Sequence, residues 1–136
     1  WLNGMMVRQG GARGRSFPDN MRRVRRLYAL EAEAREAQRG LWADESYRVH
    51  DAETLSGVTA FVIVEGRLAA VVEQAGATRA VFGSEGVTLH TDAALGPVDV
   101  PLRLEPGARL RVRGWLPANA APPAMRLTHW GQVETF

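Results

Sequence analysis

Three arginines and a tryptophan recur at every second position of one short segment, which makes them the strongest binding candidates in the sequence. The run is Arg-Leu-Arg-Val-Arg-Gly-Trp-Leu, and its alternating members are Arg109, Arg111, Arg113 and Trp115. Side chains two residues apart share one face of a β-strand, so this face would be basic and the other apolar. Guanidinium groups bind phosphate oxygens and an indole stacks on a base. These four side chains could therefore bind single-stranded nucleic acid. The favoured interpretation is an ordinary solvated strand face in a module that packs against its neighbour.

A second basic cluster lies nearer the N-terminus. Its four members, within five positions, are Arg22, Arg23, Arg25 and Arg26. They could hold phosphate, but a solvated helix face is the favoured interpretation. Trp42 could likewise stack a base, although an anchor for a helix end is favoured.

Catalytic and metal-binding patterns are weak. Glu31 falls near an apolar stripe, where packing is favoured over a role as a catalytic carboxylate. The histidines and one nearby aspartate show no metal-ligand spacing: His50, His90, Asp92 and His129. Ser56 and Ser84 lack the sharp turn that a hydrolase nucleophile requires. The sequence therefore predicts no catalytic residue, no metal site and no cofactor within this chain.

Composition narrows the classes further. The chain has 136 residues, 46% of them apolar, which is enough for a packed core. All 17 basic residues are arginine and 15 residues are acidic, so the formal charge of +2 argues only weakly for a polyanionic partner. Cysteine is absent, which excludes disulfides and thiolate chemistry. No apolar run reaches the length of a membrane-spanning helix.

Periodicity predicts two helices and then strands. Apolar residues at spacings of three and four favour helices over residues 2–9 and 20–38, with Asp19 and Asn20 as the entry signal of the second. Gly10-Gly11 and Gly40 would end them. Residues 44–56 are polar and predict a linker.

Five to seven short strands follow from residue 57. The expected strands cover residues 58–64, 68–73, 78–82, 98–104, 109–116, 125–128 and 132–135, with a kink at Gly66-Arg67 and a long connection after Gly83. Strand spacing of about ten residues favours a small barrel or sandwich. The fold class is therefore α+β.

Two resemblances add to this prediction. Residues 1–43 resemble the last two helices of a staphylococcal-nuclease-like (thermonuclease) domain, through Leu2-Asn3, Met6-Val7-Arg8-Gln9-Gly10 with Ala12, Leu30-Glu31-Ala32-Glu33-Ala34-Arg35 and Gly40-Leu41-Trp42. Residues 57–136 resemble an OB-like antiparallel β-barrel, through Val64-Glu65-Gly66-Arg67-Leu68 and the arginine-rich run. A β-module also follows the nuclease domain in some bacterial thermonuclease-like proteins.

The resemblance implies a phosphodiesterase. Enzymes of the thermonuclease family hydrolyse DNA and RNA with a calcium ion held by aspartates, a glutamate that activates water and two arginines that hold the phosphate. Those positions lie upstream of the helix that residues 2–9 resemble, so Arg8 receives no catalytic role. Because the chain opens on Trp1, we expect a C-terminal fragment whose partner is the missing nuclease barrel. The family likeness implies an exported or periplasmic parent. A non-catalytic binding or packing module stays open as the alternative.

Overall fold

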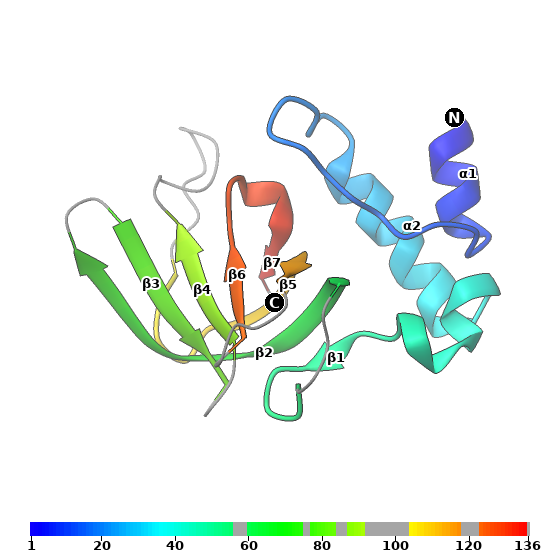
Figure 1. Cartoon of the computed structure of the whole chain (residues 1–136). Helices are drawn as coiled ribbons and strands as arrows, with labels where there is room; N and C mark the ends of the chain where they lie inside the picture. The colour runs from blue at the N-terminus through cyan, green and yellow to red at the C-terminus, as the bar shows by residue number, and fades with distance from the viewer. Residues whose placement is uncertain (56–59, 75–76, 84–86, 92–103, 118–122, 136) are drawn as a thin grey trace. The chain divides into compact units, whose positions relative to one another are not determined.

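The computed structural model describes residues 1–55, 60–74, 77–83, 87–91, 104–117 and 123–135 (Figure 1). The chain divides into two compact parts, Trp1–Arg48 and Val49–Phe136, which we call the helical unit and the β unit. The division falls within the polar range 44–56. This range holds regular structure, because it contains the 3-10 helix η2 (Glu45–Tyr47) and the short strand β1 (His50–Asp51).

The helical unit contains α1 (Leu2–Arg8), α2 (Val24–Glu36) and the 3-10 helix η1 (Gly40–Ala43). The expected bounds of α1 are confirmed to within one residue, but α2 begins four residues later than the sequence predicts. The Asn20 amide donates to the Phe17 carbonyl at 3.0 Å, so residues 17–20 form a turn with Pro18 at its second position. Asp19 and Asn20 therefore shape a turn and do not cap the helix.

The backbone after α1 and the backbone after α2 come into contact at two glycines. Gly10 and Gly40 both have positive φ, at 77° and 55°, which disfavours any residue with a side chain. The Leu41 amide donates to the Gly10 carbonyl at 2.9 Å. A Cβ atom on Gly10 would lie 2.1 Å from the carbonyl oxygen of Arg39, so the two backbones touch here. This crossing fixes where α1 ends against the segment after α2.

The β unit is one curled sheet around a long central strand. Strand β2 (Ala60–Gln74) pairs antiparallel with β3 (Ala77–Phe82) and with β5 (Arg109–Leu116). Strand β3 pairs antiparallel with β4 (Val87–Thr91), and β5 pairs antiparallel with β7 (Val133–Thr135). Strand β4 pairs parallel with β6 (Ala124–Arg126), and β1 pairs parallel with β2. The 3-10 helix η3 covers Trp130–Gln132.

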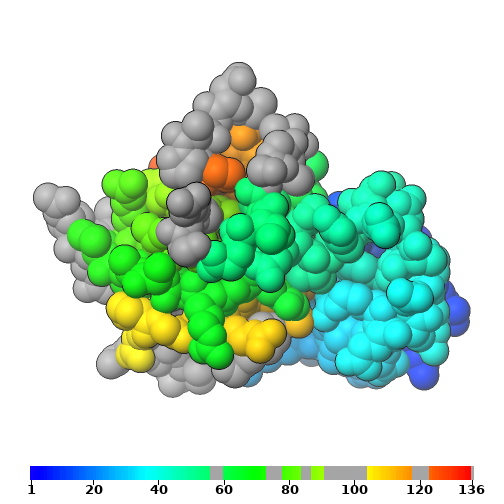
Figure 2. All heavy atoms as spheres, turned by 90° about the horizontal axis from the view of Figure 1, so that it is seen from below, coloured from blue at the N-terminus to red at the C-terminus, as the bar shows by residue number. Residues whose placement is uncertain are grey.

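A β-bulge bends β2, so that its first half pairs with β5 and its second half with β3 (Figure 1). The register shifts between Leu68 and Ala70, two residues beyond the expected kink at Gly66-Arg67. The turn before β5 lies along β2, as the yellow and green residues in Figure 2 show, because the Gly107 amide donates to the Leu68 carbonyl at 2.7 Å. One strand therefore belongs to both halves of the sheet.

The sheet is mixed, which corrects the expected antiparallel barrel. The strand order is β6-β4-β3-β2-β5-β7, with β1 beside β2. The last segment of the chain brings β6 alongside β4 and β7 alongside β5, which curls the sheet into a barrel-like shape. Strand direction depends on the path of the connections, whereas alternation of apolar residues only identifies a strand. The α+β class is confirmed with this barrel-like sheet.

The side chain of Gln132 bridges β5 and β6. Its Nε2 donates to the Arg113 carbonyl at 3.2 Å and to the Arg126 carbonyl at 3.1 Å, and its Oε1 accepts from the Thr128 amide at 2.7 Å. A Cβ atom on Gly114 would lie 2.9 Å from Gln132 Nε2, so this glycine leaves the space that the bridge occupies.

The β unit has its own apolar core, which the inner residues of every long strand supply. The buried members are Ala52, Val62, Val64, Leu68, Ala80, Phe82, Val87, Leu89, Leu110, Val112, Leu116, Met125, Leu127 and Val133. Burial of this much apolar surface is the main favourable term in folding a small domain.

Most expected strands are present, and two others are additional. Strands β3, β5, β6 and β7 lie at or within two residues of their predicted bounds. The sequence missed β1, which sits in the predicted linker, and β4, which sits in the predicted long connection after Gly83. The expected strand over residues 98–104 lies outside the described residues except for Leu104, which is not in a strand.

Candidate nucleic-acid interface

Strand β5 alternates as the sequence predicts, with one departure. Leu110, Val112, Gly114 and Leu116 are buried, and the residues between them form the opposite face. Trp115 is 60% exposed and Arg109 is also exposed. Arg113 is only 1% exposed, however, so the basic stripe is open only at its two ends.

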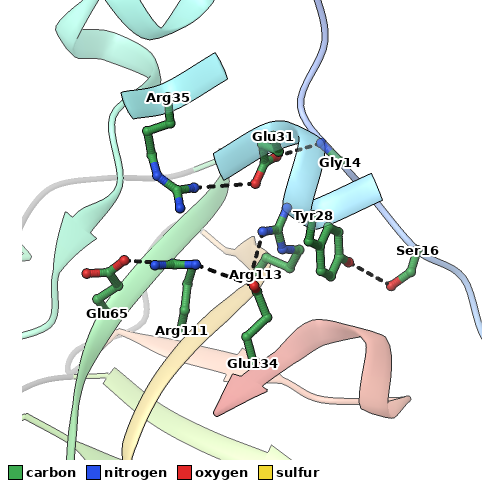
Figure 3. Close-up of polar contacts among 9 residues, drawn as sticks. All are labelled: Gly14, Ser16, Tyr28, Glu31, Arg35, Glu65, Arg111, Arg113 and Glu134. Atoms are coloured by element: carbon green, nitrogen blue, oxygen red, sulfur yellow. Dashed lines mark hydrogen bonds and ion pairs between the residues drawn. The ribbon is translucent and has the colours of Figure 1, made fainter. Parts of the chain in front are cut away.

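The middle of the stripe is occupied by ion pairs (Figure 3). Arg111 Nε lies 2.6 Å from Glu65 Oε1 and its Nη1 lies 3.4 Å from Glu134 Oε2. Arg113 Nη2 lies 2.9 Å from Glu134 Oε1. Both carboxylates are placed by register, because Arg111 is opposite Glu65 on β2 and Glu134 on β7. Two arginines are thus balanced by two glutamates.

The neutralisation of Arg111 and Arg113 by glutamates could not be predicted from the sequence. Glu65 precedes Arg111 by 46 residues and Glu134 follows it by 23, and only the strand register brings them together. Of the four predicted site residues, Arg109 and Trp115 are exposed, and they lie near the two ends of β5. Phe61 lies opposite Trp115 in the ladder and is partly exposed, which extends the aromatic surface by one ring.

The helical unit carries most of the positive charge. Trp1–Arg48 holds ten arginines and six acidic residues, a formal charge of +4, whereas Val49–Phe136 holds seven arginines and nine acidic residues, a formal charge of −2. The arginines of the basic cluster, Arg22, Arg23, Arg25 and Arg26, are all exposed. Arg23 and Arg26 lie over the Trp1 ring, with their guanidinium carbons 5.1 and 5.7 Å from its centroid. The guanidinium groups of Arg23 and Arg26 thus lie in cation–π contact with the ring of Trp1.

Glu31 has a structural position. Its side chain is fully buried, Oε1 accepts from the Gly14 amide at 2.7 Å, and Oε2 lies 3.5 Å from Arg35 Nη1 (Figure 3). The carboxylate therefore holds the segment before α2 against that helix. Nearby, the Tyr28 hydroxyl donates to Ser16 Oγ at 3.1 Å and fastens the same segment. These contacts bear out the packing interpretation of Glu31.

Trp42 is buried, as expected of an anchor. It is 7% exposed, and the Arg35 guanidinium lies over its ring at 5.6 Å. Arg35 thus contacts both Glu31 and Trp42, and it links the end of α2 to η1. A base could not stack on a ring in this position.

A row of exposed residues crosses the sheet on another face of the β unit. In the ladders, Val72 of β2 is opposite Arg79 of β3, Arg79 is opposite His90 of β4, and His90 is opposite Arg126 of β6. We call Val72, Arg79, His90 and Arg126 the outer row; all four are exposed. No sequence signal marks it, because its members lie on four strands and one of these, β4, was not predicted.

The other two histidines lie elsewhere in the β unit. His129 Nδ1 lies 2.8 Å from the Thr128 hydroxyl, and His50 is on β1. Within the part of the chain that the structure describes, no three His, Cys, Asp or Glu side chains gather where they could hold a metal ion. Neither helix in that part is long and apolar enough to cross a membrane.

No protein-family model matches this sequence, and no curated protein matches it either.

Proposed function

We propose that this chain is part of a thermonuclease-like phosphodiesterase, to which it contributes structure and substrate contacts but no catalytic residue. The observation that carries the proposal is the role of the residues on which the resemblance depends. Gly10 and Gly40 make the backbone crossing, Glu31 holds the Gly14 amide, and Ala34 and Trp42 are buried. The residues that carry the resemblance therefore lie at contacts within the helical unit, and this coincidence supports the proposal.

The catalytic part of the proposal comes from the family pattern. Calcium and two arginines would stabilise charge on the reacting phosphate, and a carboxylate would activate water. No residue of this chain matches those positions. Arg8 Nε lies 3.3 Å from Glu33 Oε2 in an exposed ion pair on the surface of the helical unit.

We propose in addition that the β unit is an OB-type module. Two features support this assignment: the long bent strand β2 pairs with a different neighbour along each half, and the final segment supplies both β6 beside β4 and β7 beside β5. Partly open Greek-key barrels of this type commonly bind oligonucleotides.

Cleavage assays on two polypeptides test the phosphodiesterase. The polypeptide encoded by the complete reading frame should cut single-stranded DNA or RNA with calcium and lose activity with a chelator. The 136-residue chain alone should cut neither, with or without calcium. Chelator-sensitive cleavage by the chain above a mock preparation, or an inactive complete polypeptide, would contradict the proposal.

A second candidate function is single-strand binding at the end of β5, which the exposure of Trp115 favours. Arg109 is the exposed arginine of the stripe, so one phosphate contact is expected there, and the slope of log affinity against log salt should be about −0.7. Trp115→Ala should weaken binding by roughly 1 to 3 kcal/mol if the indole stacks on a base. If the ring only packs, the substitution should lower the melting temperature and leave binding unchanged. Fluorescence anisotropy with a short labelled strand separates the two results.

A further inference from the structure

We propose that Glu134 is an internal substitute for a phosphate group, and that it closes a second phosphate site formed by Arg111 and Arg113. One carboxylate contacts both guanidinium groups: its Oε1 lies 2.9 Å from Arg113 Nη2 and its Oε2 lies 3.4 Å from Arg111 Nη1 (Figure 3). Two oxygens of a phosphate group would meet this pair of arginines in the same way. The inference rests on the proposed single-strand binding at the end of β5, and it adds a site that the strand reaches only when Glu134 moves away.

The charge of the site favours a phosphodiester. Glu65 Oε1 lies 2.6 Å from Arg111 Nε, and because Glu65 belongs to β2 it stays in place when β7 moves. Two arginines and one glutamate then remain, with a net charge of +1. Arg113 is buried, and a buried charge that loses a carboxylate partner is strongly disfavoured. A phosphodiester brings one negative charge, which is the charge that Glu134 supplied.

Strand β7 can release this carboxylate while the rest of the sheet stays intact. It pairs with β5 through three residues and stands at the end of the strand order. Val133 is buried in the apolar core, whereas Glu134 is partly exposed and Thr135 is exposed. Short edge segments with few buried contacts open at a low cost in free energy. A change in the backbone after Val133 therefore frees Glu134 and leaves the core residue in place.

The exposed ring of Trp115 lies close enough to contact the same nucleic-acid strand. It follows Arg113 by two positions on the same face of β5, which is a separation of about 7 Å along the strand. One nucleotide thus reaches both groups, with its phosphate on the two arginines and its base on the indole.

Glu134→Gln tests the inference, because it removes the charge and keeps the shape of the side chain. Binding of a labelled oligothymidylate to the full 136-residue chain is measured by fluorescence anisotropy at several salt concentrations. The variant should bind roughly three- to tenfold more tightly than the wild type, and one further phosphate contact should steepen the salt slope by about 0.7. The matched control is Glu105→Gln, which removes an exposed carboxylate of the β unit and changes the total charge equally. It should change the affinity by no more than about twofold.

Two further arms identify the site and its ligand. Arg113→Gln combined with Glu134→Gln should bind no more tightly than the wild type, and a gain that persists in this double variant overturns the inference. An oligothymidylate with an uncharged methylphosphonate backbone should show no gain with Glu134→Gln, because it brings no phosphate charge. If dilute inorganic phosphate at constant ionic strength abolishes the gain, the site takes a small ion and the choice of a phosphodiester is wrong.

Thermal unfolding of each variant separates binding from folding. If Glu134→Gln does not fold, Glu134→Asp replaces it, because the shorter side chain keeps the charge but cannot contact both arginines; it should raise the affinity about two- to threefold. A folded variant that gains nothing, or an equal gain in Glu105→Gln, overturns the inference and leaves Glu134 as a structural ion pair. Loss of folding in both Glu134 variants also overturns it, because a carboxylate that the fold requires cannot leave. The cleavage test and the Trp115→Ala test are unaffected by these outcomes, since both use chains that keep Glu134.

Discussion

The contacts that stabilise the helical unit internally differ in kind from those that stabilise the β unit internally. In the helical unit, two backbone segments touch at Gly10 and Gly40, and one buried carboxylate holds the segment before α2. In the β unit, a continuous ladder encloses fourteen buried apolar residues. The first arrangement depends on the absence of a side chain at particular points, and the second on the presence of side chains throughout. The two units should therefore fail under different substitutions.

The largest expected effect is that of Gly10→Ala. The positive φ of 77° costs about 1 to 2 kcal/mol for alanine, and the new Cβ would lie 2.1 Å from the Arg39 carbonyl oxygen. Together these should destabilise the helical unit by roughly 3 kcal/mol or more. Gly107→Ala is the matched control in the β unit, because Gly107 has φ 84° but nothing within 4 Å of its added Cβ. It should cost only about 1 kcal/mol.

Hydrogen exchange resolved along the chain measures both variants. Gly10→Ala should speed exchange in α1 and α2 and leave β2 protected. Equal destabilisation by the two glycine substitutions would show that backbone contact does not distinguish the units.

Removal of the buried carboxylate should have the next largest effect. Glu31→Ala leaves the buried Gly14 amide without its acceptor, which should lower stability by about 2 kcal/mol. Glu31→Gln keeps an acceptor of nearly the same shape and should cost less. Chemical denaturation of the wild-type chain and the two variants gives the order of their free energies of unfolding. If glutamine is as harmful as alanine, the charge pair with Arg35 matters more than the hydrogen bond.

A smaller effect is expected where the β unit also depends on a glycine. A Cβ on Gly114 would lie 2.9 Å from both Met125 Sδ and Gln132 Nε2. Both are ends of side chains and can shift, so Gly114→Ala should cost about 1 kcal/mol. Gln132→Ala in the same background tests the cause, because the penalty of alanine at 114 should shrink once the amide is gone. Independent, additive losses would show that Gln132 is not the obstacle.

The smallest effect concerns Asp44, at the start of η2. The backbone amide of Ser46 and then its hydroxyl hold the pKa of this exposed carboxyl below its ordinary value. A lowered pKa in the folded state means that the contribution to stability is present above the unfolded pKa, near pH 4, and is lost as the pH falls through the folded value. NMR titration of Ser46→Ala should show a partial rise, since the backbone donor remains. A complete return to the ordinary value would assign the shift to the hydroxyl alone.

Local sequence patterns predicted the helices and strands. Strand register determined which of their side chains lie next to each other. Alternation found β5 to the residue, and the apolar spacing found both helices, because these signals repeat within a few positions. The start of α2 was wrong because the Pro18 turn uses the residues that a helix cap would use. Strand β4 was missed because glycines and aspartates nearby resemble a loop.

The candidate site shows the same limit. The sequence predicted the arginine stripe on β5, but it did not predict that glutamates from β2 and β7 would neutralise Arg111 and Arg113. The outer row needs four strands to exist at all. Contacts between distant strands are fixed by sheet order and by the bulge at Leu68 to Ala70, and neither leaves a periodic trace in the chain.

The Gln132 bridge gives the barrel-like sheet a defined weak line. Among the described residues no backbone ladder joins β5 to β6. Side chains alone connect the two strands, through the two hydrogen bonds of Gln132 and the packing of Met125 near Gly114. Slow breathing motions should begin along this line, and the Thr128 amide, which donates to Gln132, should exchange its proton sooner than the amides within the β2–β5 ladder.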